Sequence, residues 1–403
     1  MHFFYSIFIQ LFGFAIHLVA NFNLKARNWL KGRENWKEKL KKKINISEKY
    51  GWIHCSSAGE FEQAIPIINE LRFKVPDLRI AVSFFSSSGF EMYKDSGLAD
   101  LFFYFPLDTK KKSKYLIEIL KPNFAIFIRN EIWLNILTYL NQKEIPVFLV
   151  NANLSQKRNF FYQKYLNYSY SLFTKIFDTK HYGNTKLERV SENKNVVFRD
   201  EILEDFCKDS LVIILGSSWL EEERFTFDFY KKFSKKDSTL KIIIAPHEYI
   251  ENSKNKILKK IKDWQTHNNI EAISYSKYKL HNTQYSILFL DKKGILKYAY
   301  KYADIAVIGG GFGKGVHNIT EAAIYGIPTI FGSNYSKFEE INDLVKLNLA
   351  FPIKDYVSYK KKMLELIEDT ELRKSTNVRL KEYFIQHKKT SSLITKDVLA
   401  YLK

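Results

Sequence analysis

Cysteine is scarce in this sequence, and several familiar nucleotide-binding patterns are missing. Only Cys55 and Cys207 occur among 403 residues, too few for a disulfide framework, and nothing resembles a metal-ligand cluster. No glycines follow the G-x-G-x-x-G pattern of a dinucleotide site, and Lys314 is followed by Gly315 instead of the Ser or Thr of a P-loop. The sequence thus lacks the marks of a disulfide-stapled domain, a metal centre and the two common nucleotide loops, and it fits a reducing compartment.

Acidic residues are outnumbered by basic ones. The chain has 63 Lys and Arg against 44 Asp and Glu, a formal net charge of +19 and a pI near 9.4. This balance implies an acidic partner, which can be nucleic acid, an anionic membrane surface or a phosphorylated substrate. Hydrophobic residues make up 46% of the chain, enough for two cores, and the length favours two or three domains.

Charge is absent from the first part of the chain. Phe3 to Val19 is almost wholly apolar and aromatic, and no Lys or Arg precedes it, so we expect a retained segment and not a cleaved signal. The polar or small interruptions recur at helical spacing: Ser6, Gln10, Gly13, His17 and Asn21. We predict a membrane anchor over residues 1–24, spanning or interfacial, with the basic residues that follow on the cytoplasmic side. The alternative is a buried core helix followed by a solvated basic helix.

From Gly51 onward, short apolar runs alternate with helical stretches, which predicts doubly wound parallel sheets of the α/β class. The first series of expected strands is 52–55, 80–85, 101–105, 124–128 and 147–150, and the second is 211–215, 241–245, 287–290, 305–308, 329–331 and 349–352. The expected domains are 25–190 and 191–403. The last helix, about 390–402, could pack back on either domain.

Polar residues follow strands of the first expected domain. Ligands of such sheets bind beyond the carboxyl ends of the strands. Ser56, Ser57, Gly59 and Glu60 follow the first strand, and Glu131 follows the fourth. Two carboxylates therefore approach one crevice. Each can be an ordinary first-turn acid, but one of them can also take a proton from an acceptor hydroxyl.

The second expected domain repeats this arrangement. Ser217 and Ser218 follow its first strand and suit phosphate, and His247 follows the next one within Pro246-His247-Glu248. Lys186 lies between the domains and could reach the ligand. Each of these is individually more often part of a turn or cap; their shared position at strand ends favours a site.

A glycine-rich loop stands between two strands of this domain, over Gly309–Glu321. Asn318 is a suitable N-cap with Glu321 as capping-box partner, so we expect a helix of about two turns to begin there. Its N–H groups and dipole would point toward Gly310, Gly311 and His317, a geometry that holds a phosphate or carboxylate. We interpret this loop as a nucleotide-sugar site.

At these residues the sequence resembles the transferases that add 3-deoxy-D-manno-oct-2-ulosonic acid (Kdo) to the lipid A precursor of Gram-negative bacteria. The segments that carry the resemblance are 52–61, 130–133, 183–186, 216–218 and above all 309–321. The sequence departs from the family in three places. The usual Gly-Gly-His-Asn is Gly315-Val316-His317-Asn318, the usual Thr-Glu-Leu-Trp-Pro is Asn130-Glu131-Ile132-Trp133-Leu134, and the common Pro-Arg-His is Pro246-His247-Glu248. The last puts a family arginine contact to the donor in doubt.

The resemblance implies a GT-B glycosyltransferase, with two Rossmann-like domains facing a cleft and an N-terminal membrane-anchoring helix. It implies CMP-Kdo as donor, inversion at the anomeric carbon, and Glu60 as general base with Glu131 beside it. The nucleotide-binding residues would be Ser217, Ser218, His247, Gly310, Gly311, His317, Asn318 and Glu321, and those on the acceptor side Ser56, Ser57, Gly59 and Lys186. No metal or other cofactor is implied, and no nucleic acid; the place of action would be the cytoplasmic side of the inner membrane.

Two alternatives stay open. The first is another membrane-associated GT-B enzyme that uses a different nucleotide sugar. The second is a non-catalytic basic protein that tethers nucleic acid or anionic lipid, although such a binder needs no cluster of carboxylates and glycines at strand ends.

Overall fold

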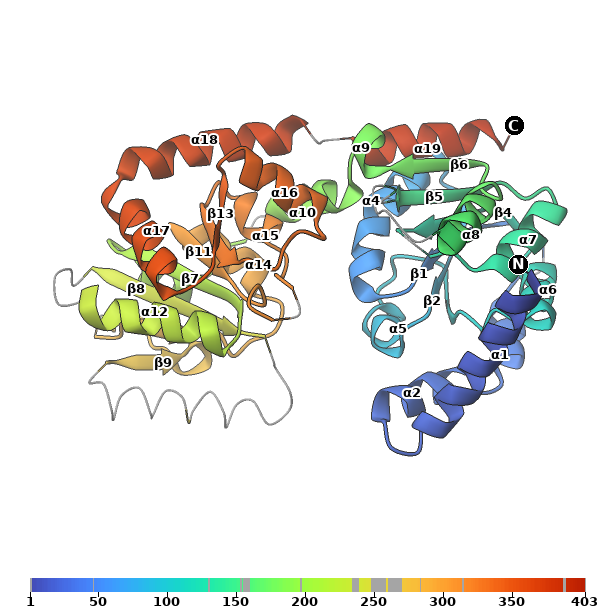
Figure 1. Cartoon of the computed structure of the whole chain (residues 1–403), viewed down its shortest axis with the longest axis horizontal. Helices are drawn as coiled ribbons and strands as arrows, with labels where there is room; N and C mark the ends of the chain where they lie inside the picture. The colour runs from blue at the N-terminus through green and yellow to red at the C-terminus, as the bar shows by residue number, and fades with distance from the viewer. Residues whose placement is uncertain are drawn as a thin grey trace. The chain divides into compact units, whose positions relative to one another are not determined.

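In the computed structural model the chain divides into two compact units, Met1–Arg189 with His387–Lys403, and Val190–Gln386. The structure describes residues 2–402 apart from 46, 130, 153, 155–159, 196–197, 234–238, 248–258, 260–269, 283, 314 and 387–388. Each unit is built on one parallel sheet with helices packed against it (Figure 1).

Unit 1 has a six-stranded sheet in the order β3-β2-β1-β4-β5-β6. Its strands are β1 Tyr50–Cys55, β2 Arg79–Phe84, β3 Leu101–Tyr104, β4 Pro122–Ile128, β5 Val147–Ala152 and β6 Lys175–Asp178. All neighbours are parallel, and the chain order reverses between β1 and β4. The carboxyl ends of β1 and β4 therefore lie side by side at the switch point where such sheets bind ligands.

Helices cover both faces of this sheet. The helices of unit 1 are α1 His2–Val19, α2 Leu24–Arg33, α3 Trp36–Lys43, α4 Ala58–Lys74, α5 Ser87–Tyr93, α6 Lys110–Leu120, α7 Leu134–Gln142, α8 Phe160–Tyr170, α9 Thr179–Tyr182 and α19 Thr390–Ala400. One core holds α4 and α19 against the sheet, and the other holds α3, α6 and α7. The last helix thus packs on unit 1, where Ile394 and Val398 are fully buried. Helix α10, Thr185–Asn195, crosses from one unit to the other.

Unit 2 has a seven-stranded parallel sheet in the order β13-β12-β11-β7-β8-β10-β9. Its strands are β7 Leu211–Ser218, β8 Leu240–Pro246, β9 Ala272–Ser274, β10 Ile287–Phe289, β11 Ile305–Ile308, β12 Thr329–Gly332 and β13 Ala350–Ile353. Its helices are α11 Glu201–Cys207, α12 Leu220–Phe233, α14 Leu296–Ala299, α15 Thr320–Ala323, α16 Glu339–Lys346, α17 Tyr356–Glu368 and α18 Thr370–Gln386, with 3₁₀ turns η1 Tyr275–Lys277 and η2 Tyr300–Tyr302. Side chains of α12 and α17 form a core with the sheet.

The predicted fold class, two doubly wound α/β units, is confirmed, and every expected strand is present. Two strands were not predicted. β6 lies in an aromatic, lysine-rich stretch that looked like a domain crossing, and β9 has only three residues, too few for a readable pattern.

Candidate functional site

The loop after β1 places Glu60 in the first turn of α4. Ser57 is the N-cap of that helix, and its side chain accepts a hydrogen bond from the Glu60 N–H. The Glu60 carboxylate in turn accepts one from the Ser56 N–H at 2.5 Å. Gly59 leaves this turn open, because a Cβ there would meet only Ser57 Oγ, at 4.0 Å. These two hydrogen bonds hold the Glu60 carboxylate against the carboxyl end of β1.

Glu60 and Glu131 form an interacting pair of carboxylates. Burial, together with the negative charge of Glu131, raises the pKa of Glu60 to about 7. Burial alone would raise the pKa of Glu131 as well, but hydrogen bonding and charge from His54, with Ser56 and Trp133, hold that pKa below its ordinary value. At neutral pH Glu131 is therefore ionised while Glu60 exchanges a proton, which is the pattern of a general base beside a fixed charge.

A buried chain of polar groups supports Glu131 from beneath. Trp52 Nε1 donates to Ser83 Oγ at 2.9 Å, and Ser83 Oγ lies 2.8 Å from His54 Nδ1. His54 Nε2 is 3.4 Å from Glu131 Oε2. The indole N–H can only donate, so the Ser83 hydroxyl accepts from Trp52 and keeps its proton and a second lone pair for His54 Nδ1. The other ring nitrogen, Nε2, faces the Glu131 carboxylate. Trp52, Ser83 and His54 are all fully buried.

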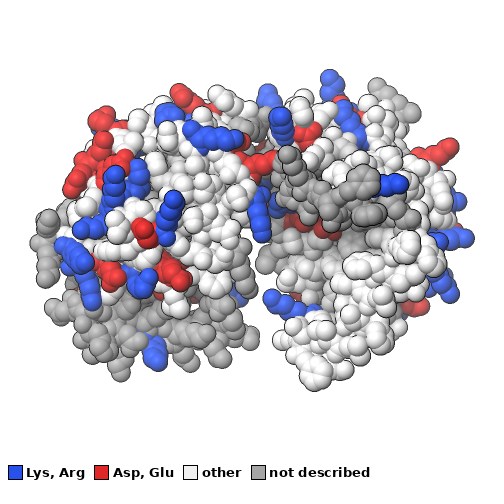
Figure 2. Space-filling view, in the orientation of Figure 1, with Lys and Arg blue, Asp and Glu red and all other residues white. Residues whose placement is uncertain are grey.

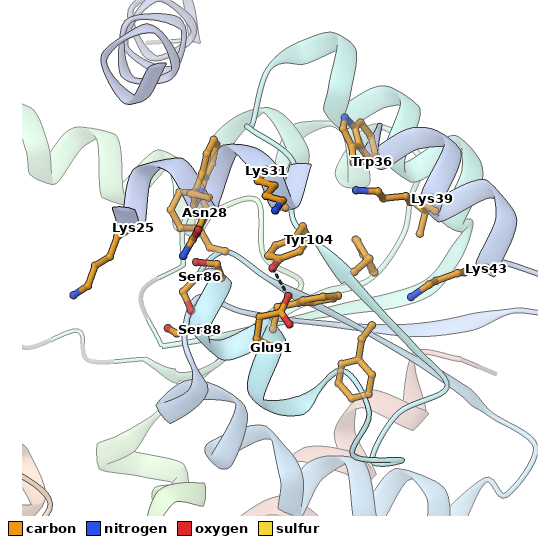
Figure 3. A pocket seen from close by; sticks show the side chains of 18 residues that line it. Lys25, Asn28, Lys31, Trp36, Lys39, Lys43, Ser86, Ser88, Glu91 and Tyr104 are labelled. Carbon is orange, nitrogen blue, oxygen red and sulfur yellow. Dashed lines mark hydrogen bonds between the residues drawn. The ribbon is translucent and has the colours of Figure 1, made fainter. Parts of the chain in front are cut away.

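A cavity of about 820 Å³ lies beside this loop, between α2, α3, α5 and β3 (Figure 3). Four lysines line it: Lys25, Lys31, Lys39 and Lys43. Among the lining residues that the structure describes, Glu91 is the one carboxylate, and it is engaged by Lys94 and the Tyr104 hydroxyl. Ser86, also in the lining, donates its N–H to the Ser56 carbonyl, so the cavity adjoins the Glu60 loop.

In unit 2 a buried carboxylate joins the first loop to the glycine loop. Glu222 accepts from the Gly310 N–H at 2.9 Å and from the Trp219 N–H at 3.2 Å. Gly310 has φ +92°, and a Cβ on Gly311 would lie 2.5 Å from the Gly332 backbone nitrogen. These glycines are therefore required for close backbone packing at the ends of β11 and β12.

The glycine loop differs from its sequence-based description in two respects. The helix after it, α15, has one turn, and its N-cap is Ile319, so the expected two-turn helix with an Asn318 capping box is wrong. Asn318 accepts from the Thr320 hydroxyl and donates to Glu321 Oε1 at 3.0 Å. Several N–H groups of the loop are also engaged within the protein, those of Gly309, Gly310, Gly313, Gly315 and His317. An anion at this edge must therefore rely largely on side chains.

Aromatic rings form one wall at the same edge of unit 2. Trp219 donates its Nε1–H to His317 Nε2 at 3.0 Å, and His247 stacks on both, with ring centroids 4.9 and 4.2 Å away. Burial, with the charge of His247, lowers the pKa of His317 to about 4, so His317 is neutral at physiological pH. Ser218 is buried and donates to Glu223, while Ser217 occupies the left-handed region with φ +50°. A non-glycine residue in that region is often part of a functional site.

The candidate residues thus form two groups. Unit 1 carries Ser56, Ser57, Gly59, Glu60 and Glu131, and unit 2 carries Ser217, Ser218, His247, Gly310, Gly311, His317, Asn318 and Glu321. Lys186 belongs to unit 1, one residue after Thr185, whose hydroxyl donates to the Gln63 carbonyl of α4. Asn130, Glu248 and Lys314 lie outside the described residues. Among those described, no group of three His, Cys, Asp or Glu side chains could hold a metal ion.

Sequence reasoning missed the roles of Ser83, Trp219 and Glu222. A serine inside the apolar strand β2 was a usable signal, because a buried hydroxyl needs a partner. Glu222 was one of three consecutive acids, and nothing in the sequence distinguished it from its neighbours.

Comparisons with known proteins agree with this architecture. Residues 34–191 match the family model described as 3-deoxy-D-manno-octulosonic-acid transferase. The chain is 27% identical over 321 residues to the 3-deoxy-D-manno-octulosonic acid transferase of Aquifex aeolicus, covering 78% of this chain and 85% of that protein. It is 25% identical over 395 residues to a bifunctional glycosyltransferase/methyltransferase of Fusobacterium nucleatum, covering 87% of this chain but 59% of the longer protein.

Solved structures show the same fold. UDP-GlcNAc 2-epimerase from Neisseria meningitidis matches 87% of this chain and 100% of its own with a TM-score of 0.59 at 14% identity. A glycosyltransferase from Rickettsia africae matches 88% of this chain and 98% of its own with a TM-score of 0.52 at 13% identity. The architecture is therefore GT-B. Residues 34–191 match the Kdo transferase family model, and the chain is similar to Kdo transferases over most of its length.

Proposed function

We propose that this protein is an inverting glycosyltransferase that moves Kdo from CMP-Kdo to a phosphorylated lipid A precursor, at the cytoplasmic face of the inner membrane. The observation that carries the proposal is the Glu60 carboxyl, which stands at the switch point of unit 1 with its pKa raised to about 7, within the matched domain. A base with a pKa near the working pH is suited to remove a proton from a sugar hydroxyl.

In the proposed reaction the acceptor hydroxyl attacks the anomeric carbon of Kdo while Glu60 takes its proton. The new C–O bond forms as the bond from that carbon to the phosphate oxygen breaks, and CMP leaves as a phosphate monoester with the bonding electrons. The hydroxyl of Ser217 is proposed to stabilise the leaving phosphate, with His317 beside it as a neutral hydrogen-bonding group. Ser218, whose buried hydroxyl donates to Glu223, is assigned to supporting the same loop. Asn318 and Glu321 are assigned to ribose hydroxyls, because a carboxylate would repel the phosphate.

The lysine-lined cavity is assigned to the acceptor's phosphorylated head. The cavity favours an anion, because four lysine ammonium groups line it and its one carboxylate, Glu91, is paired with Lys94. The aromatic residues in the lining, among them Trp29 and Phe85, offer apolar surface. The Ser86–Ser56 hydrogen bond connects this cavity to the Glu60 loop, so an acceptor held there would lie near the base.

Changing Lys31 to Glu should raise KM for the phosphorylated acceptor by about tenfold or more, which corresponds to about 1.4 kcal/mol, with a small change in kcat. The reason is that a carboxylate placed among the remaining lysines repels the acceptor phosphate. Lys37→Glu makes the same charge change on α3 outside the cavity lining, where Lys37 lies over the Tyr115 ring. Equal KM values for these two variants would remove the cavity from the acceptor site.

Changing Glu131 to Gln should move the acid limb of the pH–rate profile to lower pH. In the parent the base is active only when ionised, so kcat/KM should rise as pH increases through about 7. Removing the negative charge of Glu131 makes ionisation of Glu60 easier, and the limb falls toward the ordinary pKa of a glutamate. Rates measured from pH 5 to 9 test this; an unmoved limb would show that the two carboxylates are not coupled.

Donor class is tested by calorimetric titration of the detergent-solubilised full chain with CMP and with UDP. The proposal expects CMP to bind and UDP to bind at least tenfold more weakly. Tighter binding of UDP would replace the proposal with a GT-B enzyme that uses another nucleotide sugar.

A further inference from the structure

Helix α1 has a docked face and an exposed apolar face. The docked face repeats every three or four residues along the whole helix and into the turn after it: His2, Tyr5, Ser6, Ile9, Phe12, Gly13, Ile16 and Ala20 are buried or half-buried. The exposed face is formed mostly by large apolar side chains: Phe3, Phe4, Ile7, Phe8, Leu11, Phe14, Leu18 and Val19. Gln10, Ala15 and His17 are the other exposed residues of the helix. The helix has the length and apolar content to cross a bilayer, and 11% of it is buried within the protein.

Specific contacts hold the docked face on unit 1. The Tyr5 hydroxyl donates to Asp108 Oδ2 at 2.7 Å, and Ser6 Oγ lies 3.4 Å from Asn135 Oδ1. Asp108 is buried, and it also accepts from the Ser113 hydroxyl and from two backbone N–H groups at the start of α7. At Gly13 a Cβ would lie 2.6 Å from Leu107 Cδ2, so the helix touches unit 1 there as closely as glycine allows.

This docking is incompatible with a membrane-spanning α1. A spanning helix of this length needs hydrocarbon around nearly all of its 18 residues, since the core of a bilayer is about 30 Å thick. The groups that hold α1 are a buried carboxylate, an amide and hydroxyls of a globular sheet domain. Removing Tyr5 from Asp108 would leave that buried carboxylate with one hydrogen-bond donor fewer.

We propose that α1 is an in-plane anchor. Its docked face stays on unit 1, and its exposed face enters the acyl region of a single leaflet. The exposed face of α1 thus binds a lipid surface. This inference rests on the proposed function and specifies how the protein would associate with the membrane.

Two observations favour lipid as the occupant. The apolar face continues beyond α1 through Phe22, which is 94% exposed, and Leu24. In Figure 2 the surface over α1 shows no charged side chain. Directly after it, α2 and α3 carry Lys25, Lys31, Lys39 and Lys43 around the cavity of Figure 3, and lysines that follow an apolar helix face suit the anionic headgroups of a lipid surface.

The test is a disulfide cross-link between Ser6→Cys and Asn135→Cys in the full chain bound to vesicles that contain anionic phospholipid. Cys207→Ser removes the half-buried native thiol, while Cys55 is fully buried and unreactive because burial raises its pKa. Phe8→Cys with Asn135→Cys is the matched control, because Phe8 lies on the exposed face. Oxidation with copper phenanthroline should cross-link most of the Ser6 pair and little of the control pair, both in detergent and on vesicles.

In a spanning helix, residue 6 would lie about 20 Å along the axis from residue 19, deep in the bilayer and away from Asn135. A Ser6 pair that cross-links in detergent but not on vesicles would therefore overturn the in-plane anchor. Failure of the full chain to float with the vesicles would also overturn it, and would at the same time remove the membrane association. The double variant Phe4→Glu with Phe8→Glu should float with vesicles at least tenfold less than the parent while the Ser6 cross-link still forms, and this result supports the proposal.

Discussion

Replacing Glu60 with Gln should lower kcat by about 100-fold or more, the range for losing a general base, while CMP still binds. The amide keeps the size of the side chain, and its oxygen can still accept from the Ser56 N–H, so the first turn of α4 keeps its geometry. The amide cannot take the proton of the acceptor hydroxyl. Single-turnover rates at saturating donor and acceptor separate this effect from weaker binding.

Glu70→Gln is the control for this change. Glu70 lies on the same helix and pairs with Lys74 away from the strand end, so its loss should leave kcat within about twofold. Thermal unfolding of both variants shows whether the fold is kept. A Glu60→Gln enzyme with the rate of its parent would exclude Glu60 as the base.

Replacing Gly311 with Ala should weaken CMP binding by about tenfold or more and lower the free energy of unfolding by about 1–3 kcal/mol, the range for overpacking. The added Cβ would lie 2.5 Å from the Gly332 nitrogen, and the neighbour is backbone that cannot turn aside. The glycine loop would have to move away from β12, and with it Gly310, which Glu222 holds.

Gly313→Ala is the matched control in the same loop. A Cβ at that position would approach only the Gly310 carbonyl oxygen, at 4.0 Å. CMP affinity and unfolding free energy should therefore stay close to the parent values. If both substitutions weaken CMP binding equally, the effect comes from loop flexibility and not from the contact with Gly332.

The sequence was informative where periodicity and position decide the structure. Buried parallel strands are continuous apolar runs, and the polar residues that follow them must meet at one edge of the sheet, which is why Glu60 and Glu131 could be paired before their geometry was known. The fold class followed from the same alternation of strands and helices.

The remaining features depend on contacts that no local pattern contains. The support of Glu131 by Ser83 and Trp52 joins strands that are adjacent only in the sheet. Helix α15 has one turn and is followed by Gly326 in the left-handed region, and the sequence pattern alone did not show how early the helix ends. The docked face of α1 depends on Asp108, about 100 residues away, so its polar stripe was only partly identified: Ser6 and Gly13 face unit 1, while Gln10 and His17 are exposed.

Kdo transfer itself is measured by incubating the detergent-solubilised full chain with tetraacyl lipid A precursor and CMP-Kdo generated in place, and by reading the products by mass spectrometry. We expect a mass gain of one or more Kdo units on the lipid, with release of CMP, and no gain with the Glu60→Gln variant. An unchanged lipid mass, with CMP-Kdo bound and the protein folded, would contradict the assigned acceptor and with it the proposed transfer.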